Sequence, residues 1–241
     1  MFAGELNAFL ADVGIKERCW FHVSDEPFVR QYRSYKNRSD LVKTLFPDYP
    51  VIDALSDFTF YAHGAVQTPI PAVNHIEPFA GKVPSLWTYY CCSQHKDYVP
   101  NRFFSMPSLR NRVLGVLMYK YDVHGFLQWG YNFWYSQLSV REIDPFTVTD
   151  AGKAFPSGDA FVVYPGENGT PLLSLRLKVF YEALQDMRAL QLLEQHIGRD
   201  ATEALLEEGL EQPLSFTTYP REDAWLLTLR EKVNARIQQH S

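Results

Sequence analysis

The sequence predicts an α/β protein whose strands form a parallel sheet of the TIM (β/α)₈ barrel type. Strand-like and helix-like segments alternate along the chain, a pattern that favours right-handed β–α–β units. Of the 241 residues, 46% are hydrophobic and 21% are charged, which is typical of a globular domain. A chain of this length can bury one large core, so we expect a single domain over residues 1–241.

The first half of the chain is expected to contain short strands between helices. In chain order, the expected elements are a helix over 5–13, a strand over 18–23, helical segments over 28–46, a minor element at 51–52, a strand over 58–62, a loop over 63–75 and a strand over 86–92. Gly14 suits the position after a helix. Ser39 or Asp40 is expected to cap a second helical piece within 28–46.

The second half is expected to be richer in helix. Its expected elements are a helix over 107–121, strands over 125–134 and 160–164, a long helix over 172–197 that stops before Gly198, and helices over 201–210 and 222–238. Five strands are too few to close an eight-stranded barrel. We therefore expect a barrel that is incomplete at its N-terminus and holds about the last five βα units, completed by missing strands or by a partner chain.

Composition and charge argue against several classes of partner. The net charge is −5 with no basic tract, which disfavours nucleic acid. No apolar run approaches the roughly 20 residues of a membrane span. No signal peptide is visible, which makes the cytoplasm the default location. The cysteines Cys19, Cys91 and Cys92 are expected to be reduced thiols, and no metal or cofactor is expected.

Two adjacent acids, Asp25 and Glu26, follow the first expected strand and precede Pro27. In parallel α/β folds, chemistry gathers at the carboxyl ends of the strands. Like charges in one site push the pKa of one acid upward and leave the other low, which suits acid–base chemistry on a sugar. A proline closes the strand behind them. The alternative is a solvated strand end with no catalytic role.

The strand expected over 125–134 presents two different faces. Leu127, Trp129 and their alternate neighbours are large and apolar, as expected against covering helices. The other face carries the polar and aromatic set Gln128, Asn132 and Trp134, which we predict to face a binding pocket. Aromatic residues make up 15% of the chain and can stack on the apolar faces of sugars, although core packing is their commoner role.

Several motifs together resemble a known family. The motifs are Ser24-Asp25-Glu26-Pro27, Trp87-Thr88-Tyr89-Tyr90-Cys91-Cys92, the run from Gly125 to Trp134, the stretch from Asp144-Pro145 to Gly166, and the segment from Ser174 to Asp186. In combination they resemble the catalytic domain of glycoside hydrolase family 123 and its relatives in domain of unknown function 4091. The resemblance implies a (β/α)₈ barrel and a retaining N-acetyl-β-galactosaminidase. Ala183 replaces a glycine that is usual in the family.

The resemblance also implies substrate-assisted catalysis on terminal N-acetyl-β-hexosaminides, in which the 2-acetamido oxygen of the sugar attacks the anomeric carbon. Asp25 would hold the acetamido group, and Glu26 would protonate the leaving oxygen and later activate water. Tyr89 and His75 are further candidates for contacts with the sugar. His63 and His75 could instead be metal ligands, a reading that we favour less.

Two alternatives remain. The first is a carbohydrate-binding protein with no catalytic activity. The second is a conventional retaining glycosidase, which needs a second carboxylate about 5–5.5 Å from the acid. Asp144 and Asp159 are the candidates for that carboxylate by motif position.

Overall fold

A computed structural model describes residues 2–240 as two compact units. The first unit contains residues 2–89 and 124–127, and the second contains residues 90–123 and 128–240.

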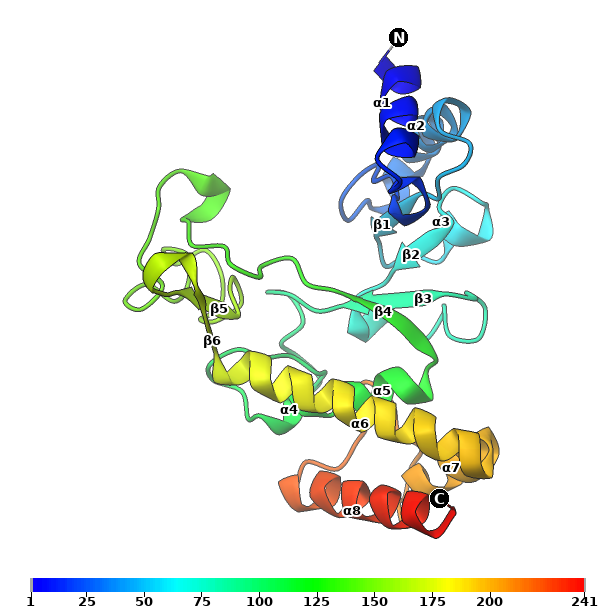
Figure 1. The fold of residues 1–241 in the computed structure, drawn as a ribbon, viewed down its shortest axis with the longest axis vertical. Helices are drawn as coiled ribbons and strands as arrows, with labels where there is room; N and C mark the ends of the chain where they lie inside the picture. Colours follow the sequence, from blue (N-terminus) through cyan, green and yellow to red (C-terminus); the bar gives the residue numbers. More distant parts are fainter. Residues whose placement is uncertain (1, 241) are drawn as a thin grey trace. The chain divides into compact units, whose positions relative to one another are not determined.

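The first unit alternates short strands with helices (Figure 1). Its elements are helix α1 (Phe2–Asp12), 3-10 turns at Lys16–Arg18, Val29–Gln31 and Val73–His75, helices α2 (Tyr32–Leu45) and α3 (Thr59–Ala62), and strands β1 (Ile52–Ala54), β2 (Thr68–Ile70), β3 (Leu86–Tyr89) and β4 (Val123–Leu127), of which His124–Leu127 lie in this unit.

The strands of the first unit lie side by side in chain order. Phe21 pairs in parallel with Val51, β1 pairs in parallel with β2, and β3 pairs with β4. A parallel bridge between Ala72 and Tyr89 continues the order from β2 to β3. This arrangement confirms the mixed α/β class. Residues 2–240 form no closed barrel.

Aromatic side chains fix the helices of the first unit to its strands. The Phe21 ring stacks on Phe46 with centroids 4.1 Å apart, and Leu10 and Tyr49 complete this cluster beneath α1. On α2, the buried Tyr35 packs edge-to-face on Phe60 of α3, with centroids 5.0 Å apart. The first cluster packs α1 beside the bridge at Phe21, and the second contact packs α2 against α3.

The second unit is mainly helical. Its elements are helices α4 (Leu109–Arg112), α5 (Leu114–Lys120), α6 (Leu175–Ile197), α7 (Arg199–Glu207) and α8 (Asp223–His240), the antiparallel hairpin β5 (Val163–Pro165) and β6 (Pro171–Leu173), and 3-10 turns at Gln137–Ser139 and Glu167–Gly169.

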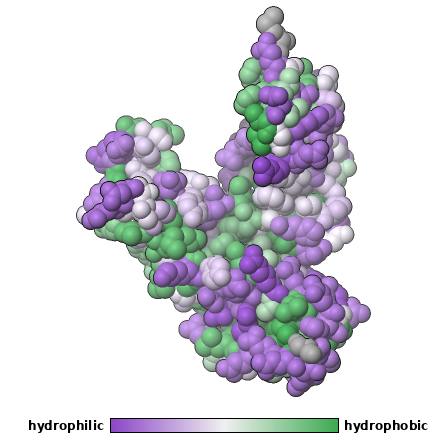
Figure 2. All heavy atoms as spheres, in the orientation of Figure 1, coloured by the Kyte–Doolittle hydropathy of each residue, from purple (hydrophilic) through white to green (hydrophobic). Residues whose placement is uncertain are grey.

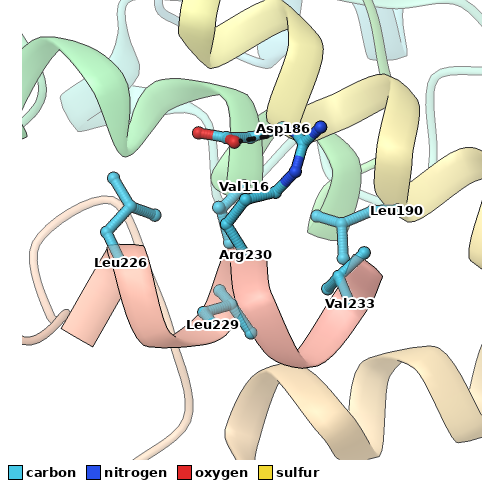
Figure 3. Close-up of a pocket in the computed structure, with 7 residues that line it drawn as sticks. All are labelled: Val116, Asp186, Leu190, Leu226, Leu229, Arg230 and Val233. Atoms are coloured by element: carbon cyan, nitrogen blue, oxygen red, sulfur yellow. Dashed lines mark hydrogen bonds and ion pairs between the residues drawn. The ribbon is translucent and has the colours of Figure 1, made fainter. Parts of the chain in front are cut away.

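Helix α6 is the central element of this unit and packs against α4, α5, α7 and α8. The Ser174 hydroxyl accepts a hydrogen bond from the amide of Leu177 and caps the start of α6. Between α5, α6 and α8 lies a small pocket with an apolar lining, into which Asp186 and Arg230 project (Figure 3). Around β6 and the first turn of α6 the surface is apolar, with Leu172, Leu173 and Leu175 exposed (Figure 2).

Helices α5 and α6 approach each other most closely at Gly115. A Cβ atom on Gly115 would lie 1.8 Å from the carbonyl oxygen of Ala183. The small residue Ala183, fully buried on α6, is part of the same close contact. The Gly115 position therefore requires a glycine.

Replacing Gly115 with alanine should destabilise the protein by about 1–3 kcal/mol or more, because the two helix backbones must separate. Urea unfolding followed by circular dichroism measures the change. Gly4→Ala is the matched control: Gly4 also lies in a helix, with nothing near its missing Cβ. The control should keep or slightly raise stability. Equal stability for Gly115→Ala and the wild type would contradict this packing.

Several predicted elements are wrong in type or extent. The expected strand over 58–62 is helix α3, because the Asp57 carboxylate accepts the amide of Thr59, 2.9 Å away, and begins a helical turn. The expected loop over 63–75 contains strand β2. The strand expected over 125–134 ends at Leu127.

Other predictions hold in part. The break in the helical segment 28–46 falls between Gln31 and Tyr32, and not at Ser39, which is buried inside α2 with its hydroxyl donating to the carbonyl of Ala65. The strand expected over 18–23 is reduced to the single bridge at Phe21. The remaining helices agree with expectation to within a few residues, although residues 107–121 divide into α4 and α5.

Candidate active site

The two acids Asp25 and Glu26 lie on an exposed bend that follows the parallel bridge at Phe21. Glu26 has a φ of 42°, a left-handed conformation that is uncommon for a residue with a side chain. Its amide donates to the carbonyl oxygen of Ala54 on β1 over 2.9 Å. The next residue, Pro27, is buried. The bend therefore carries two exposed acids just after the bridge at Phe21, and its backbone remains attached to β1.

Tyr89, at the end of β3, reaches the same place. Its hydroxyl donates a hydrogen bond to Oε1 of Glu26, and the tyrosine is only 6% exposed. A buried donor of this kind restricts the rotation of the Glu26 carboxyl group. The structure thus brings together Glu26 and Tyr89, two of the residues predicted from sequence, although they lie 63 positions apart along the chain.

His75 lies in the 3-10 turn after β2 and is exposed. Its amide donates to the carbonyl oxygen of Ala72, the residue whose bridge to Tyr89 links this segment to β3. The turn is therefore tied to the strand that carries Tyr89.

Sequence reasoning missed Asp53, a buried acid on β1. Its side chain is 1% exposed, and its carboxylate accepts hydrogen bonds from the amides of Val23 and Ser24 at 2.9 and 3.2 Å. The Tyr35 hydroxyl also donates to it, and the His22 imidazole contacts it. Burial raises the pKa of Asp53, and the hydrogen bond from Tyr35 opposes this rise. An acid inside the apolar run Val51-Ile52-Asp53-Ala54-Leu55 was the available signal.

Gln128, Asn132 and Trp134 were predicted as one face of the strand expected over 125–134. They lie in the second unit, beyond the end of β4. Gln128 donates to the carbonyl of Gly130 over 3.2 Å, and the Trp134 indole donates to the carbonyl of Val163 over 3.0 Å. Asn132 is exposed and forms an antiparallel bridge with Phe161. The alternation of faces on which these predictions rested stops at Leu127, because the chain leaves the strand there.

A buried ionic cluster in the second unit also escaped prediction. Asp159 is fully buried, and within residues 2–240 neither of its carboxylate oxygens has a hydrogen-bond partner. Arg102 donates to the backbone carbonyl of Asp159 over 2.9 Å, and Arg176 donates to that of Gly158. The Arg102 guanidinium also lies 5.0 Å from the ring centroid of Tyr90. Burial raises the pKa of Asp159 to about 7, although Arg102 opposes the shift.

The pKa of Asp159 gives a signed prediction for stability. Its carboxyl group titrates near 3.8 when unfolded and near 7 when folded, so the folded state binds more protons between these values. Stability should therefore fall as pH rises from about 4 to about 7, by up to about 1.4 kcal/mol per pH unit, and level off above that. Urea unfolding at a series of pH values measures this slope. Asp159→Asn should flatten it, whereas an unchanged slope in that variant would assign the dependence to other groups.

The second acid required by a conventional retaining glycosidase has two candidates by sequence. Asp159 is buried as described, and Asp144 is exposed, with Oδ1 accepting the amide of Phe146 over 3.0 Å. Asp144 thus shapes its own turn.

Within residues 2–240, no group of three or more His, Cys, Asp or Glu side chains is placed to hold a metal ion. Over the same residues no helix has the length and apolar character needed to cross a bilayer. Within residues 2–240, no disulfide joins Cys19, Cys91 or Cys92.

The parallel strands in chain order define an α/β fold, in which the Tyr89 hydroxyl at the end of β3 contacts Glu26. The family model "Glycoside hydrolase 123, catalytic domain" matches residues 1–193. The chain belongs to this family. No curated protein matches the chain.

Among solved structures, the chain is similar to a family 123 glycoside hydrolase from Clostridium perfringens, described in a study of glycolipid glycan hydrolysis. The TM-score is 0.68 at 15% identity. The match covers 99% of this chain and 45% of the other. This similarity supports the α/β fold, and the chain spans less than half the length of that enzyme.

Proposed function

We propose that the protein is a retaining glycoside hydrolase that removes terminal N-acetyl-β-hexosamine residues, of the N-acetyl-β-galactosaminidase type, by substrate-assisted catalysis. The observation that carries the proposal is the bend at residues 25–26, where Glu26 is held by the Tyr89 hydroxyl and Asp25 lies beside it. Membership of the glycoside hydrolase family supports the reaction class. We also propose that the strands of the first unit belong to a (β/α)₈ barrel that further strands complete.

In the first step, the acetamido oxygen of the substrate attacks the anomeric carbon. The bond from that carbon to the leaving oxygen breaks, and the Glu26 carboxyl group donates its proton to the departing oxygen. Asp25 accepts a hydrogen bond from the acetamido N–H, which orients the attacking oxygen and stabilises the positive charge of the oxazolinium ion.

In the second step, the Glu26 carboxylate takes a proton from water as the water oxygen attacks the anomeric carbon. The oxazolinium ring opens, the acetamide is restored and the configuration at the anomeric carbon is retained. Neighbouring positions on one bend suit this division of roles, because the acetamido group and the leaving oxygen are close together on one sugar. The carboxyl orientation that both steps need is supplied by Tyr89.

The remaining candidates would bind the sugar. His75, on a turn tied to the Tyr89 strand, is proposed to contact a sugar hydroxyl. For Gln128, Asn132 and Trp134, which belong to the second unit, a role in sugar binding remains a prediction from the sequence, and Asn132 is the most exposed of the three. In this role, His75→Ala would raise KM more than it lowers kcat.

The proposal is tested with 4-nitrophenyl N-acetyl-β-galactosaminide and its N-acetyl-β-glucosaminide epimer. We expect release of nitrophenol from at least the first, and inhibition by a thiazoline analogue of the oxazolinium ion. Turnover that the thiazoline does not inhibit would favour a conventional carboxylate nucleophile. Calorimetric binding of N-acetylgalactosamine without turnover would favour a carbohydrate-binding protein.

A further inference from the structure

The backbone immediately before the two acids is held by one side chain. The amides of Val23 and Ser24 both point at the carboxylate of Asp53, at 2.9 and 3.2 Å. We infer that Asp53 is a positioning residue for the acid–base reaction, acting through the bend that carries Asp25 and Glu26. The inference rests on the proposed function of those two acids.

The bend is anchored to two successive residues of β1. The Asp53 side chain binds the backbone at residues 23 and 24, and the Ala54 carbonyl accepts the amide of Glu26 over 2.9 Å. Between these anchors the chain must place Glu26 at a φ of 42°. A left-handed conformation costs a residue with a side chain about 1–2 kcal/mol, so the surroundings must hold it there. Loosening one anchor would let the bend relax and shift the Glu26 carboxyl group away from Tyr89.

A carboxylate is suited to this position because of the number of donors around it. Tyr35 of α2 donates its hydroxyl to Asp53, and His22 lies against it as well, so four groups from two segments, residues 22–24 and α2, converge on two oxygens. A side-chain amide offers only one acceptor oxygen and two N–H donors, which would face some of these groups donor to donor. A buried carboxylate is costly unless it is hydrogen-bonded, and these donors meet that condition.

A positioning role predicts an effect that a purely structural role does not. A displaced Glu26 would protonate the leaving oxygen poorly, and the loss would depend on how much help that oxygen needs. General loss of folded enzyme would lower the rates of all substrates by the same factor. The ratio of rates for a poor and a good leaving group therefore separates the two roles.

The experiment compares the wild type, Asp53→Asn and Tyr35→Phe on two N-acetyl-β-galactosaminides, with 4-nitrophenol and the better leaving group 2,4-dinitrophenol. For Asp53→Asn we expect kcat on the 4-nitrophenyl substrate to fall by about 10- to 100-fold with little change in KM. The fall should be several-fold smaller on the dinitrophenyl substrate. Tyr35→Phe removes one donor, should retain the fold and should show the same pattern more weakly.

Ser39→Ala is the matched control. Like Tyr35, Ser39 is a buried hydroxyl residue of α2, but its hydroxyl donates to the carbonyl of Ala65. It should lower thermal stability and leave kcat on both substrates unchanged.

Equal losses on both substrates, or no loss, for Asp53→Asn and Tyr35→Phe would overturn the inference. If Asp53→Asn does not fold, Tyr35→Phe decides alone. Glu26→Gln is measured in parallel. If it hydrolyses the 4-nitrophenyl substrate like the wild type, the proposed function has failed and not only the role of Asp53.

Discussion

Replacing Glu26 with glutamine should reduce kcat for 4-nitrophenyl N-acetyl-β-galactosaminide by about 10²- to 10⁴-fold, the usual contribution of a general acid or base. The amide keeps an oxygen that can accept from the Tyr89 hydroxyl, so the bend should stay in place. It has no proton to give to the leaving oxygen and cannot accept one from water. KM should change little, because the interaction that is lost belongs to the transition state.

The leaving group gives this variant a second signature. With 2,4-dinitrophenol, departure needs little protonation, so the first step should be nearly restored and the second step should limit the rate. Glu17→Gln is the control, since Glu17 is an exposed acid of the first unit in the 3-10 turn at residues 16–18. It should hydrolyse both substrates at the rate of the wild type. Wild-type rates for Glu26→Gln on the 4-nitrophenyl substrate would remove Glu26 from the mechanism.

Asp25→Asn is expected to affect a different step. An asparagine beside the acetamido group can still accept one hydrogen bond, but it carries no negative charge to stabilise the oxazolinium ion. Turnover should fall for both leaving groups by a similar factor, because formation of the ring is impaired in each case. The thiazoline inhibitor should also bind more weakly. The contrast between the two variants assigns separate roles to the two acids.

Replacing Asp186 with asparagine should lower the free energy of unfolding by about 2–3 kcal/mol, because a buried carboxylate loses its charged hydrogen bonds to two partly exposed arginines. Asp186 is 4% exposed on α6 and lies beside Arg230 of α8 (Figure 3). Arg112 of α4 donates to both of its oxygens, at 2.7 and 3.1 Å, and Arg230 of α8 donates over 3.0 Å. The hydrogen bond to this carboxylate raises the pKa of Arg112, and in the variant both guanidinium groups would lose the charged group that they share.

Urea unfolding measures this loss. The matched control is Glu208→Gln, because the pair between Glu208 and Lys232 also reaches α8 and measures 2.8 Å, but both side chains are exposed. Exposed pairs contribute little to stability, so the control should have a midpoint close to that of the wild type. Equal midpoints for Asp186→Asn and Glu208→Gln would show that the network around Asp186 does not hold α4, α6 and α8 together.

The long helices follow from local signals in the sequence, whereas the limits and the pairing of the strands do not. Helix α6 could be predicted from its apolar spacing and from Gly198 at its end. Strand β2 could not, because Pro69 and Pro71 disfavour a strand. In the structure, Thr68 donates to Val51 and Ile70 accepts from Leu55, so the backbone of β1 pairs with alternate residues of the segment. Pro69 lies between them, where no N–H toward β1 is needed.

In the candidate site, too, the individual residues could be predicted from the sequence, but the contacts between them could not. Asp25 and Glu26 could be found as a carboxylate pair before a proline, and Tyr89 as a residue at a strand end. Their contact, however, depends on the pairing that brings β3 to the segment after β2, and no local pattern encodes it. Asp53 was missed because its donors come from the backbone at residues 23 and 24 and from the Tyr35 side chain.

The role of the substrate's own acetamido group is tested most directly by varying that group on the wild-type protein. A series of 4-nitrophenyl β-galactosaminides with acetyl, difluoroacetyl and trifluoroacetyl groups on nitrogen changes the nucleophilicity of the carbonyl oxygen while the leaving group stays the same. If the acetamido oxygen attacks the anomeric carbon and Asp25 orients it, kcat should fall steeply with each increase in fluorine. A value of kcat that is the same across the series would contradict the account and assign the attack to an enzyme carboxylate.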